Sequence, residues 1–366
     1  MRTFRLAERE RAIHRGMEFI YRTACEPENF DQYSYDFLCC FHVISASSSD
    51  PDLKRQARAM GRERARAFRR KYPRLPADVD ADMIAFLVFG DDAAIRLGVR
   101  ENNLKDQIRR VAGGFAAKDY LWFDAPNEPP PVDIPEECEC GALNTRGKKV
   151  CRRCKQPLEM MSRYAIYIDA LTRAYIGERY GVTLGARYAD VIKWLPGLRP
   201  YEEHRNGDNP HFYWEVYAIT HVVYTMNDYS LYRLSPRWFP DEFAFLKKNL
   251  KEAIAMGDAE TLGEFMDALK AFGLGEAHPL IRQGVDYLLA TQNEDGSWGD
   301  MEAEDIYGRY HPTWTAIDGL RQYAWRGERL SFPRLRPLIE QWSAKPRRYK
   351  DIAAKPRVLR QAGSAR

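Results

Sequence analysis

The chain has 366 residues, with 56 Lys and Arg against 52 Asp and Glu, so its formal net charge is only +4. This small excess gives no electrostatic reason to expect a nucleic-acid partner, and the basic run Arg62–Arg74 is typical of a solvated outer helix face. The sequence contains neither an apolar stretch long enough to span a membrane nor the apolar core of a signal peptide. We therefore expect a cytoplasmic protein without a membrane span.

Apolar residues recur at helical spacing along almost the whole chain, and hardly any segment alternates as a half-buried strand does. The sequence therefore predicts an all-α protein with two kinds of helix. The first kind is amphipathic and charge-rich, and it is expected at 5–24, 50–71, 101–118, 185–195, 240–256 and 277–291. The second kind is apolar around most of its circumference, so that it must be enclosed by other helices. It is expected at 33–47, 80–90, 160–177, 210–227, 259–273 and 310–325.

A short pattern recurs in the six apolar segments, where a His or an Asp is followed by mostly aliphatic residues. Its members are His42, Asp82, Asp169, His221, Asp267 and Asp318. Six enclosed helices that alternate with charged ones favour a ring of about six helical hairpins around an axis. The simpler interpretation of these polar residues is that they form caps and interhelical hydrogen bonds, repeated because the hairpin is repeated.

The joint "ATQNEDGSWGD" at 290–300 places Gln292, Gly296 and Trp298 at Gln-x3-Gly-x-Trp spacing between two predicted helices. We expect a brace between repeats, in which the glutamine bonds backbone groups at a helix end, the glycine permits a turn and the tryptophan covers the glutamine. This spacing resembles the QW motif of the triterpene cyclases. The following "YHPTWTAIDGL" at 310–320 is similar to the inner-helix repeat of the terpene cyclase and protein prenyltransferase superfamily. The resemblance implies an α/α toroid with a central cavity.

The same resemblance bears on chemistry. In prenyltransferase β-subunits a Tyr-His-Thr sequence at this place supplies a zinc-ligand histidine, which implies that role for His311 here. The Asp-x-Asp-Asp motif of class II terpene cyclases does not occur, and its nearest string, "DVDAD" at 78–82, is typical of an acidic helix N-terminus. The Asp-x-Cys zinc pair of the prenyltransferases is not found outside the cysteine-rich insertion either. Neither triterpene cyclisation nor prenyl transfer in its usual form is therefore expected.

A cysteine-rich insertion at 135–158 interrupts the helical pattern. Its Cys138-x-Cys140 and Cys151-x2-Cys154 knuckles resemble a zinc ribbon, and four thiolates suit a structural zinc ion that also drives folding. The alternative is a redox or unligated cluster. The insertion divides the chain into the first part of the toroid at 1–134, the ribbon at 135–158, the remainder of the toroid at 159–330 and a basic C-terminal tail at 331–366.

The ribbon follows a stiff, Pro-rich segment at 124–135, so we expect it to be displayed outside the toroid. It carries many basic residues but no aromatic platform within its knuckles, which favours a structural role or a protein partner over a nucleic-acid partner.

Histidines and acids in the enclosed helices suggest a second site. Burying His42 and His221 is costly unless they are paired, deprotonated or bound to metal. Asp36 and Glu215 each precede one of these histidines by six residues, about 600° of helix, so neither pair can chelate an ion from one face. His211 and Glu215, four residues apart, do share a face. The expected cavity ligands for Zn²⁺ or Fe²⁺ are His42, His211, Glu215, His221 and His311.

The leading hypothesis is a metal-dependent enzyme that acts in the central cavity on an apolar or aromatic substrate, isoprenoids included. Its expected catalytic residues are Asp36, Glu215 and His311, with Asp36 as the acid/base. Aromatic residues make up 13% of the chain, and a cavity that they line suits a bulky apolar body or a cation held over ring faces. The alternative is a non-catalytic scaffold whose ribbon docks a protein or nucleic-acid partner.

Overall fold

The computed structural model describes residues 2–100, 102–202, 209 and 211–344. Within these residues the secondary structure is helical, with isolated β-bridges but no strand. The prediction of an all-α chain is therefore confirmed for the described part. No helix in this part combines the length and the apolar character needed to cross a membrane.

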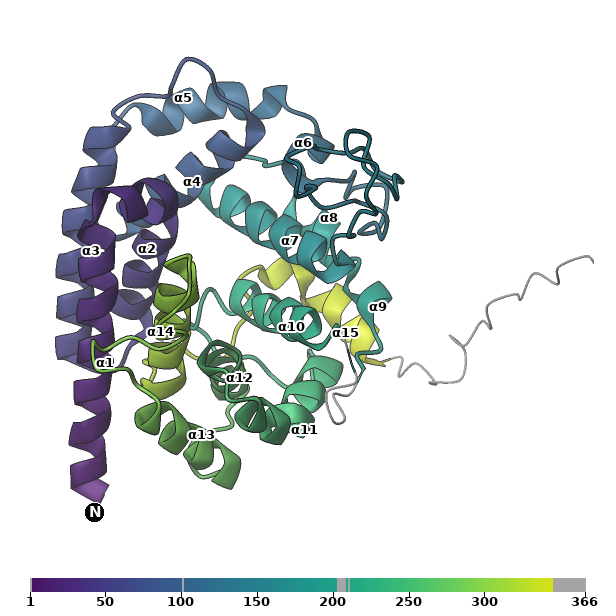
Figure 1. Ribbon diagram of the computed structural model, residues 1–366. Helices are drawn as coiled ribbons and strands as arrows, with labels where there is room; N and C mark the ends of the chain where they lie inside the picture. The colour runs from purple at the N-terminus through teal and green to yellow at the C-terminus, as the bar shows by residue number, and fades with distance from the viewer. Residues whose placement is uncertain (1, 101, 203–208, 210, 345–366) are drawn as a thin grey trace, which may run out of the picture.

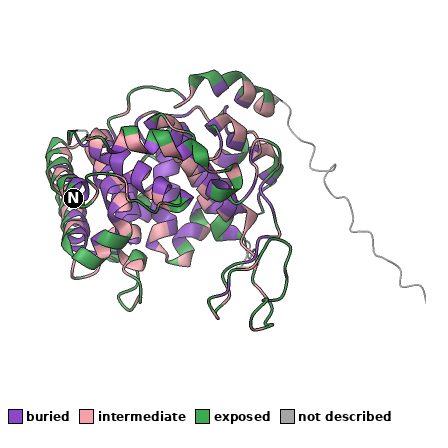
Figure 2. Cartoon of the chain, turned by 90° about the horizontal axis from the view of Figure 1, so that it is seen from above, coloured by how far each residue is buried: buried purple, intermediate pink, exposed green. Residues whose placement is uncertain are grey.

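Six enclosed helices lie around one centre, and outer helices pack against them (Figure 1). Each enclosed helix contacts the next one along the chain: α2 (Pro27–Ser47), α4 (Ala81–Arg96), α7 (Arg163–Tyr180), α10 (Phe212–Met226), α12 (Ala259–Ala271) and α14 (Tyr307–Leu320). The principal outer helices are α1 (Arg2–Cys25), α3 (Pro51–Lys71), α5 (Leu104–Val111), α11 (Pro240–Met256), α13 (Pro279–Ala290) and α15 (Arg336–Ala344). Buried residues gather on the enclosed helices and exposed residues on the outer ones, as the two predicted kinds of helix require (Figure 2).

The last enclosed helix lies against the first. Near the N-terminal end of α14, the Tyr310 hydroxyl donates a 2.8 Å hydrogen bond to Asp36 Oδ2 of α2, and its ring packs 4.5 Å from that of Phe37. Just beyond the C-terminal end of α14, Arg321 Nη1 donates to Ser47 Oγ at 2.9 Å. Contacts at both ends show that the two helices run in the same direction, so matching ends of α2 and α14 face the same side of the molecule.

The joint at 290–300 braces α1, α13 and α14. It reaches α14 through the backbone N–H of Trp298, which donates to Thr313 Oγ1 at 2.8 Å. Gln292 Nε2 donates to the carbonyl of Ala12 in α1 at 2.8 Å and to that of Gly296 at 2.9 Å. Trp298 is fully buried, and its indole N–H donates to the carbonyl of Leu288 in the last turn of α13 at 2.8 Å. Gly296 has a φ of +94°, and a Cβ there would lie 2.7 Å from the carbonyl oxygen of Arg15. The brace forms, but tryptophan rather than glutamine satisfies the helix-terminal carbonyl.

Two of the predicted outer helices do not form as single continuous helices. The segment 101–118 breaks into α5, a 3-10 turn at Ala112–Gly114 and the short α6 (Ala117–Leu121), because two adjacent glycines favour helix termination. The segment 185–195 forms only α8 (Tyr188–Ile192), and a separate one-turn helix, α9 (Leu195–Leu198), follows with Pro196 in its first turn.

The insertion and the C-terminal segment have boundaries of their own. The base of the insertion is closed by backbone hydrogen bonds of 2.8 Å from Glu136 N to Glu159 O and from Met161 N to Ile134 O, so it is slightly wider than 135–158. The predicted tail at 331–366 begins as part of the helical body, because a 3-10 turn (Pro333–Leu335) leads into α15 and buries Ile339. Residues 345–366 lie outside the described residues.

Candidate functional site

The six enclosed helices surround a cavity of about 880 Å³, a volume within the range of small-molecule sites. Every one of the six contributes side chains to its wall. Acids and aromatic rings dominate this wall, among them Asp36, Phe89, Asp169, Tyr224, Glu264, Tyr307 and Trp314. The cavity therefore combines charged groups with the flat apolar surfaces that hold an organic ligand.

An imidazole and a carboxylate form an ion pair at this wall. His311 Nδ1 lies 3.2 Å from Glu260 Oε1, which also accepts a 3.0 Å hydrogen bond from the Tyr217 hydroxyl. Tyr307 stacks on the imidazole with ring centroids 4.7 Å apart. Burial alone would lower the pKa of His311, but the Glu260 carboxylate outweighs it and raises this pKa to about 9. Burial likewise opposes ionisation of Glu260, yet His311 holds the pKa of that carboxyl below its usual range. The pair is therefore ionised at neutral pH.

Helix α12 presents a row of acids at positions i, i+4 and i+7, namely Glu260, Glu264 and Asp267. Glu264 accepts a hydrogen bond from the Thr220 hydroxyl, and Ser230 Oγ donates to Asp267 at 3.0 Å. Burial raises the pKa of Glu264 to about 8 and that of Asp267 to about 7. Within the described residues neither acid lies at ion-pair distance from a Lys or Arg. Both can therefore hold or release a proton near neutral pH.

Asp36 lies across the cavity on α2. It accepts the hydrogen bond from Tyr310, and burial raises its pKa although His311 opposes that rise. Like the two acids of α12, Asp36 makes no ion pair with a Lys or Arg of the described residues. The structure therefore places this predicted acid/base where it can exchange a proton with a cavity ligand.

The cationic side chains of the wall are already paired with acids. Arg179 lies 3.0 Å from Asp228 and 3.5 Å from Asp92. Arg173 bonds Asp169 at 2.9 Å and also reaches Asp82 at the cavity mouth. These arginines neutralise their own carboxylates, and neither forms an ion pair with Glu264, Asp267 or Asp36.

His42 and His221 line the cavity as neutral imidazoles. His221 Nδ1 is 2.8 Å from the carbonyl of Tyr217, and burial lowers the pKa of this histidine to about 4. Burial also lowers the pKa of His42 to about 3. Both histidines therefore share one cavity with His311, as the sequence predicts, and each offers a neutral ring nitrogen at physiological pH.

The predicted pair of His211 and Glu215 is not part of this cavity. His211 is exposed and precedes α10, where its backbone N–H donates to Asn209 Oδ1 at 2.9 Å. Glu215 is buried on the α7 side of α10, where it accepts bonds from the Tyr164 hydroxyl at 2.9 Å and from Asn209 Nδ2 at 3.0 Å. Hydrogen bonds within the protein thus satisfy the carboxylate of Glu215. The structure does not bring His211 or Glu215 to His311, so the five predicted cavity ligands do not form one cluster.

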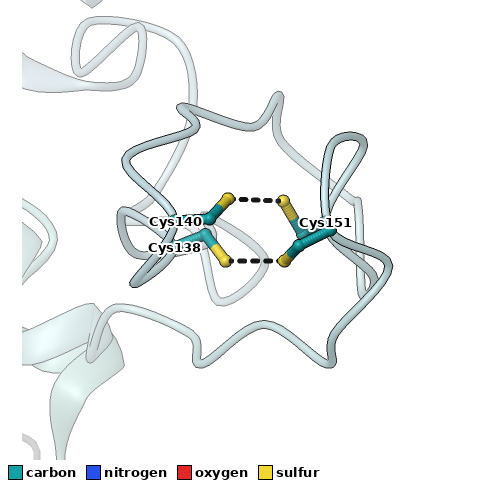
Figure 3. Close-up of side chains that lie close together, drawn as sticks. Cys138, Cys140 and Cys151 are labelled. Carbon is teal, nitrogen blue, oxygen red and sulfur yellow. Dashed lines mark hydrogen bonds between the residues drawn. The ribbon is translucent and has the colours of Figure 1, made fainter.

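The four insertion cysteines do converge (Figure 3). Sγ of Cys138 lies 3.4 Å from that of Cys154, and Sγ of Cys140 lies 3.7 Å from that of Cys151. All four sulfurs lie within 4.8 Å of one another. Among the described residues, no other group of three or more His, Cys, Asp or Glu side chains comes together closely enough to hold a metal ion. A tetrahedral ion with bonds of about 2.3 Å holds its sulfurs about 3.8 Å apart, and the two separations of 3.4 Å and 3.7 Å lie near that value.

The backbone of the knuckles also favours thiolates. Arg153 N lies 3.4 Å from Cys151 Sγ, and N–H groups of Cys154 and Arg153 lower the pKa of the Cys151 thiol to about 6. Gly141, with a φ of +74°, permits the tight turn after Cys138. The cluster could thus hold a metal ion such as zinc, and the donor set fits that ion.

Sequence reasoning missed Glu260 and Glu264, and it singled out only Asp267 on this helix. The signal lies in "AETLGEFMDAL" at 259–269, where three acids share one face of an otherwise apolar helix. Comparisons with protein-family models, with curated proteins and with solved structures found no match for this chain. Its function therefore has to be inferred from the cavity and the cysteine cluster themselves.

Proposed function

We propose that the chain is an enzyme on an α/α toroid of the kind found in the terpene cyclase and prenyltransferase superfamily. It acts by acid–base catalysis on an apolar or aromatic substrate in the cavity that the six enclosed helices surround. The ordered contacts between successive enclosed helices, and the contact of α14 with α2, support the toroid. The observation that carries the enzymatic proposal is the meeting of an ionised His311–Glu260 pair with protonatable acids at the wall of one cavity.

Each group has a role that its surroundings favour. Glu264, with a pKa of about 8, can exchange a proton near neutral pH and serves as a general acid or base. Asp36 keeps the predicted acid/base role, with Tyr310 orienting its carboxyl. His311, held as an imidazolium by Glu260, stabilises negative charge that develops on the substrate. Glu264 thus takes the place that the sequence prediction gave to Glu215.

Turnover of candidate substrates tests this proposal. Purified protein is incubated with prenyl alcohols, prenyl diphosphates and alkylated phenols, and products are identified by mass spectrometry. At least one substrate class is turned over, and Glu264→Gln and Asp36→Asn each lower the rate by about 10²-fold or more. Glu18→Gln, a change at an exposed position of α1, leaves the rate unchanged. A complete absence of turnover, or variants as active as the native chain, removes the proposal.

A cavity metal remains a prediction, with His42 and His221 as the neutral imidazoles. His311 joins them as a ligand only when it releases the proton that Glu260 stabilises. Elemental analysis of the purified chain separates the two metal sites. One zinc per chain that is lost in Cys151→Ser belongs to the ribbon. An additional zinc or iron ion that is lost in His221→Ala or His311→Ala belongs to the cavity.

A second candidate function, docking of a protein partner by the ribbon, has its own observation. Val132, Leu143 and Val150 are 67%, 66% and 50% exposed, and basic residues surround the last two. Exposed aliphatic side chains on so small a unit favour contact with another protein. If the ribbon docks a protein, the double variant Leu143→Asp/Val150→Asp no longer forms the complex with that protein that size-exclusion chromatography shows for the native chain. Turnover of substrates in the cavity stays unchanged. A complex that survives both substitutions removes the ribbon as its docking surface.

A further inference from the structure

We propose that the ligand of the cavity is a cation: an organic ammonium group on an apolar or aromatic body, bound with its charge against Glu264 and Asp267 of α12. This inference rests on the proposed function, because it names the substrate class for the same cavity. It also extends that function, because acid–base chemistry by itself does not require a charged substrate.

The charge balance of the wall is the first argument. Arg173 and Arg179 are each engaged by carboxylates, whereas Glu264 and Asp267 have only hydroxyl donors at hydrogen-bond distance in the described part of the chain. Both acids are nearly fully buried, with 2% and 3% of their surface exposed, and both line the cavity. His311 acts on Glu264, and Arg321 and Lys270 act on Asp267, only through space. A bound cation supplies the direct ion pair that neither acid has within the described residues.

The aromatic surfaces of the same wall are the second argument. Tyr224, Tyr307 and Trp314 line the cavity together with the two acids, and Tyr224 stacks on Tyr229 with ring centroids 5.9 Å apart. Ring faces beside carboxylates are the combination that recognises alkylated ammonium groups. Trp314 is 8% exposed and adds a further ring to this part of the wall.

Proton linkage gives the binding a pH dependence. Glu264 faces His311 from α14, Glu260 and Asp267 from its own helix, and Thr220 from α10. Asp267 faces Asp318, Arg321 and Tyr323 of the α14 end, Lys270 of α12 and Ser230. Each acid is neutral below its pKa, about 8 for Glu264 and about 7 for Asp267, and ionised above it. A cation favours the ionised acids, so binding releases protons and the affinity rises with pH.

The test uses two probes of similar shape. (1-Naphthylmethyl)trimethylammonium carries a permanent charge, so that any pH dependence belongs to the protein, and 1-naphthalenemethanol is its neutral counterpart. Titration calorimetry follows both probes from about pH 6 to about pH 9, with the full chain. We expect the affinity for the cation to rise between tenfold and a hundredfold over this interval, on the order set by one carboxyl with a raised pKa. The neutral probe shows no such rise.

Variants assign the effect to the two acids. Glu264→Gln and Asp267→Asn each flatten the pH profile and weaken binding of the cation at the upper pH, while Glu18→Gln behaves as the native chain. Circular dichroism confirms that each variant is folded, and the two acids provide independent tests if one variant is not. Equal affinity for the two probes, or a pH profile that neither variant changes, overturns the inference.

Turnover separates this inference from the proposed function. If neutral substrates are turned over while the ammonium probe does not bind, the inference of a cationic ligand fails and the enzymatic proposal stands. If the ammonium probe binds with the expected pH dependence but neither amines nor neutral compounds are turned over, the inference stands and the enzymatic proposal fails.

Discussion

The ribbon and the cavity are assembled in opposite ways. The four ribbon cysteines lie within one short stretch, 138–154, and their sulfurs come within 4.8 Å of one another. The cavity acids and imidazoles come from six helices spread between 27 and 320, and the nearest partner of a given group is often far away in sequence. His311 and Glu260 are one such pair.

This difference shows what each region depends on. The insertion is short and its cysteines are close together in the chain, so these residues and their spacing are visible in the sequence. The cavity depends on how the enclosed helices are rotated and how closely they approach, which packing decides. Changes in the ribbon should therefore leave the body intact, whereas changes in the body should alter the cavity.

Cys151→Ser is expected to have the largest effect, and it tests the independence of the ribbon. Loss of one of four ligands removes most of the metal-binding free energy, on the order of 10 kcal/mol for a structural zinc site. Elemental analysis should show zinc falling from one ion per chain to almost none, while the thermal unfolding of the helices followed by circular dichroism stays unchanged. Cys25→Ser, at an exposed cysteine outside the cluster, should retain the metal. A body that unfolds together with the ribbon would contradict this independence.

Trp298→Ala tests the brace that holds α1, α13 and α14. The substitution removes a fully buried indole and its hydrogen bond to Leu288, and should lower the free energy of unfolding by about 3–5 kcal/mol. Chemical denaturation measures the loss. Trp214→Ala is the matched control, because Trp214 is 42% exposed and should cost much less. Equal losses in the two variants would show that the joint is no special support of the body.

Gly263→Ala tests the close approach of α12 and α14 that brings the row of acids to His311. A Cβ at Gly263 would overlap the backbone carbonyl of Thr315, so the helices must separate at a cost of about 1–3 kcal/mol. Chemical denaturation measures the loss of stability. NMR titration measures the pKa of His311, which should fall. Gly113→Ala, where nothing lies within 4 Å, should be neutral or slightly stabilising. An unchanged His311 titration would mean that the cavity does not depend on this contact.

Glu260→Gln should have the smallest effect on stability, about 1–2 kcal/mol, and it isolates the electrostatics of the cavity. The folded-state pKa of His311, about 9, exceeds its ordinary value of 6.5, and that of Glu260 lies below its ordinary value of 4.5, so the pair stabilises the native chain fully between about pH 4.5 and about pH 6.5. That contribution disappears as pH rises through about 9. The variant should be less stable than the native chain at neutral pH, and the two should be equally stable once the pH is above about 9. A pH-independent difference between them would indicate a packing effect.

Much of the architecture follows from local patterns. Nearly all of the predicted enclosed and outer helices form, because their apolar residues recur at helical spacing and their ends carry recognisable signals such as Pro240 and Gly257. The helix predicted at 101–118 failed because Gly113 and Gly114 weaken it more than its amphipathic pattern supports it. The cysteine cluster of the insertion was visible for the same local reason as the helices, since four cysteines at knuckle spacing have few other structural uses.

The structure brings some of the predicted cavity residues to one cavity and leaves others outside it. Asp36, His42, His221 and His311 do line one cavity, but His211 and Glu215 were chosen because they share a helix face, and that face is turned away from it. Spacing along a helix determines which residues lie side by side, and it leaves open which side of the helix faces the cavity. The fit of α12 against α14 and of α10 against α7 settled this rotation. Thus the sequence alone determined the helices and the cysteine knuckles, whereas only tertiary packing decided which acids meet His311.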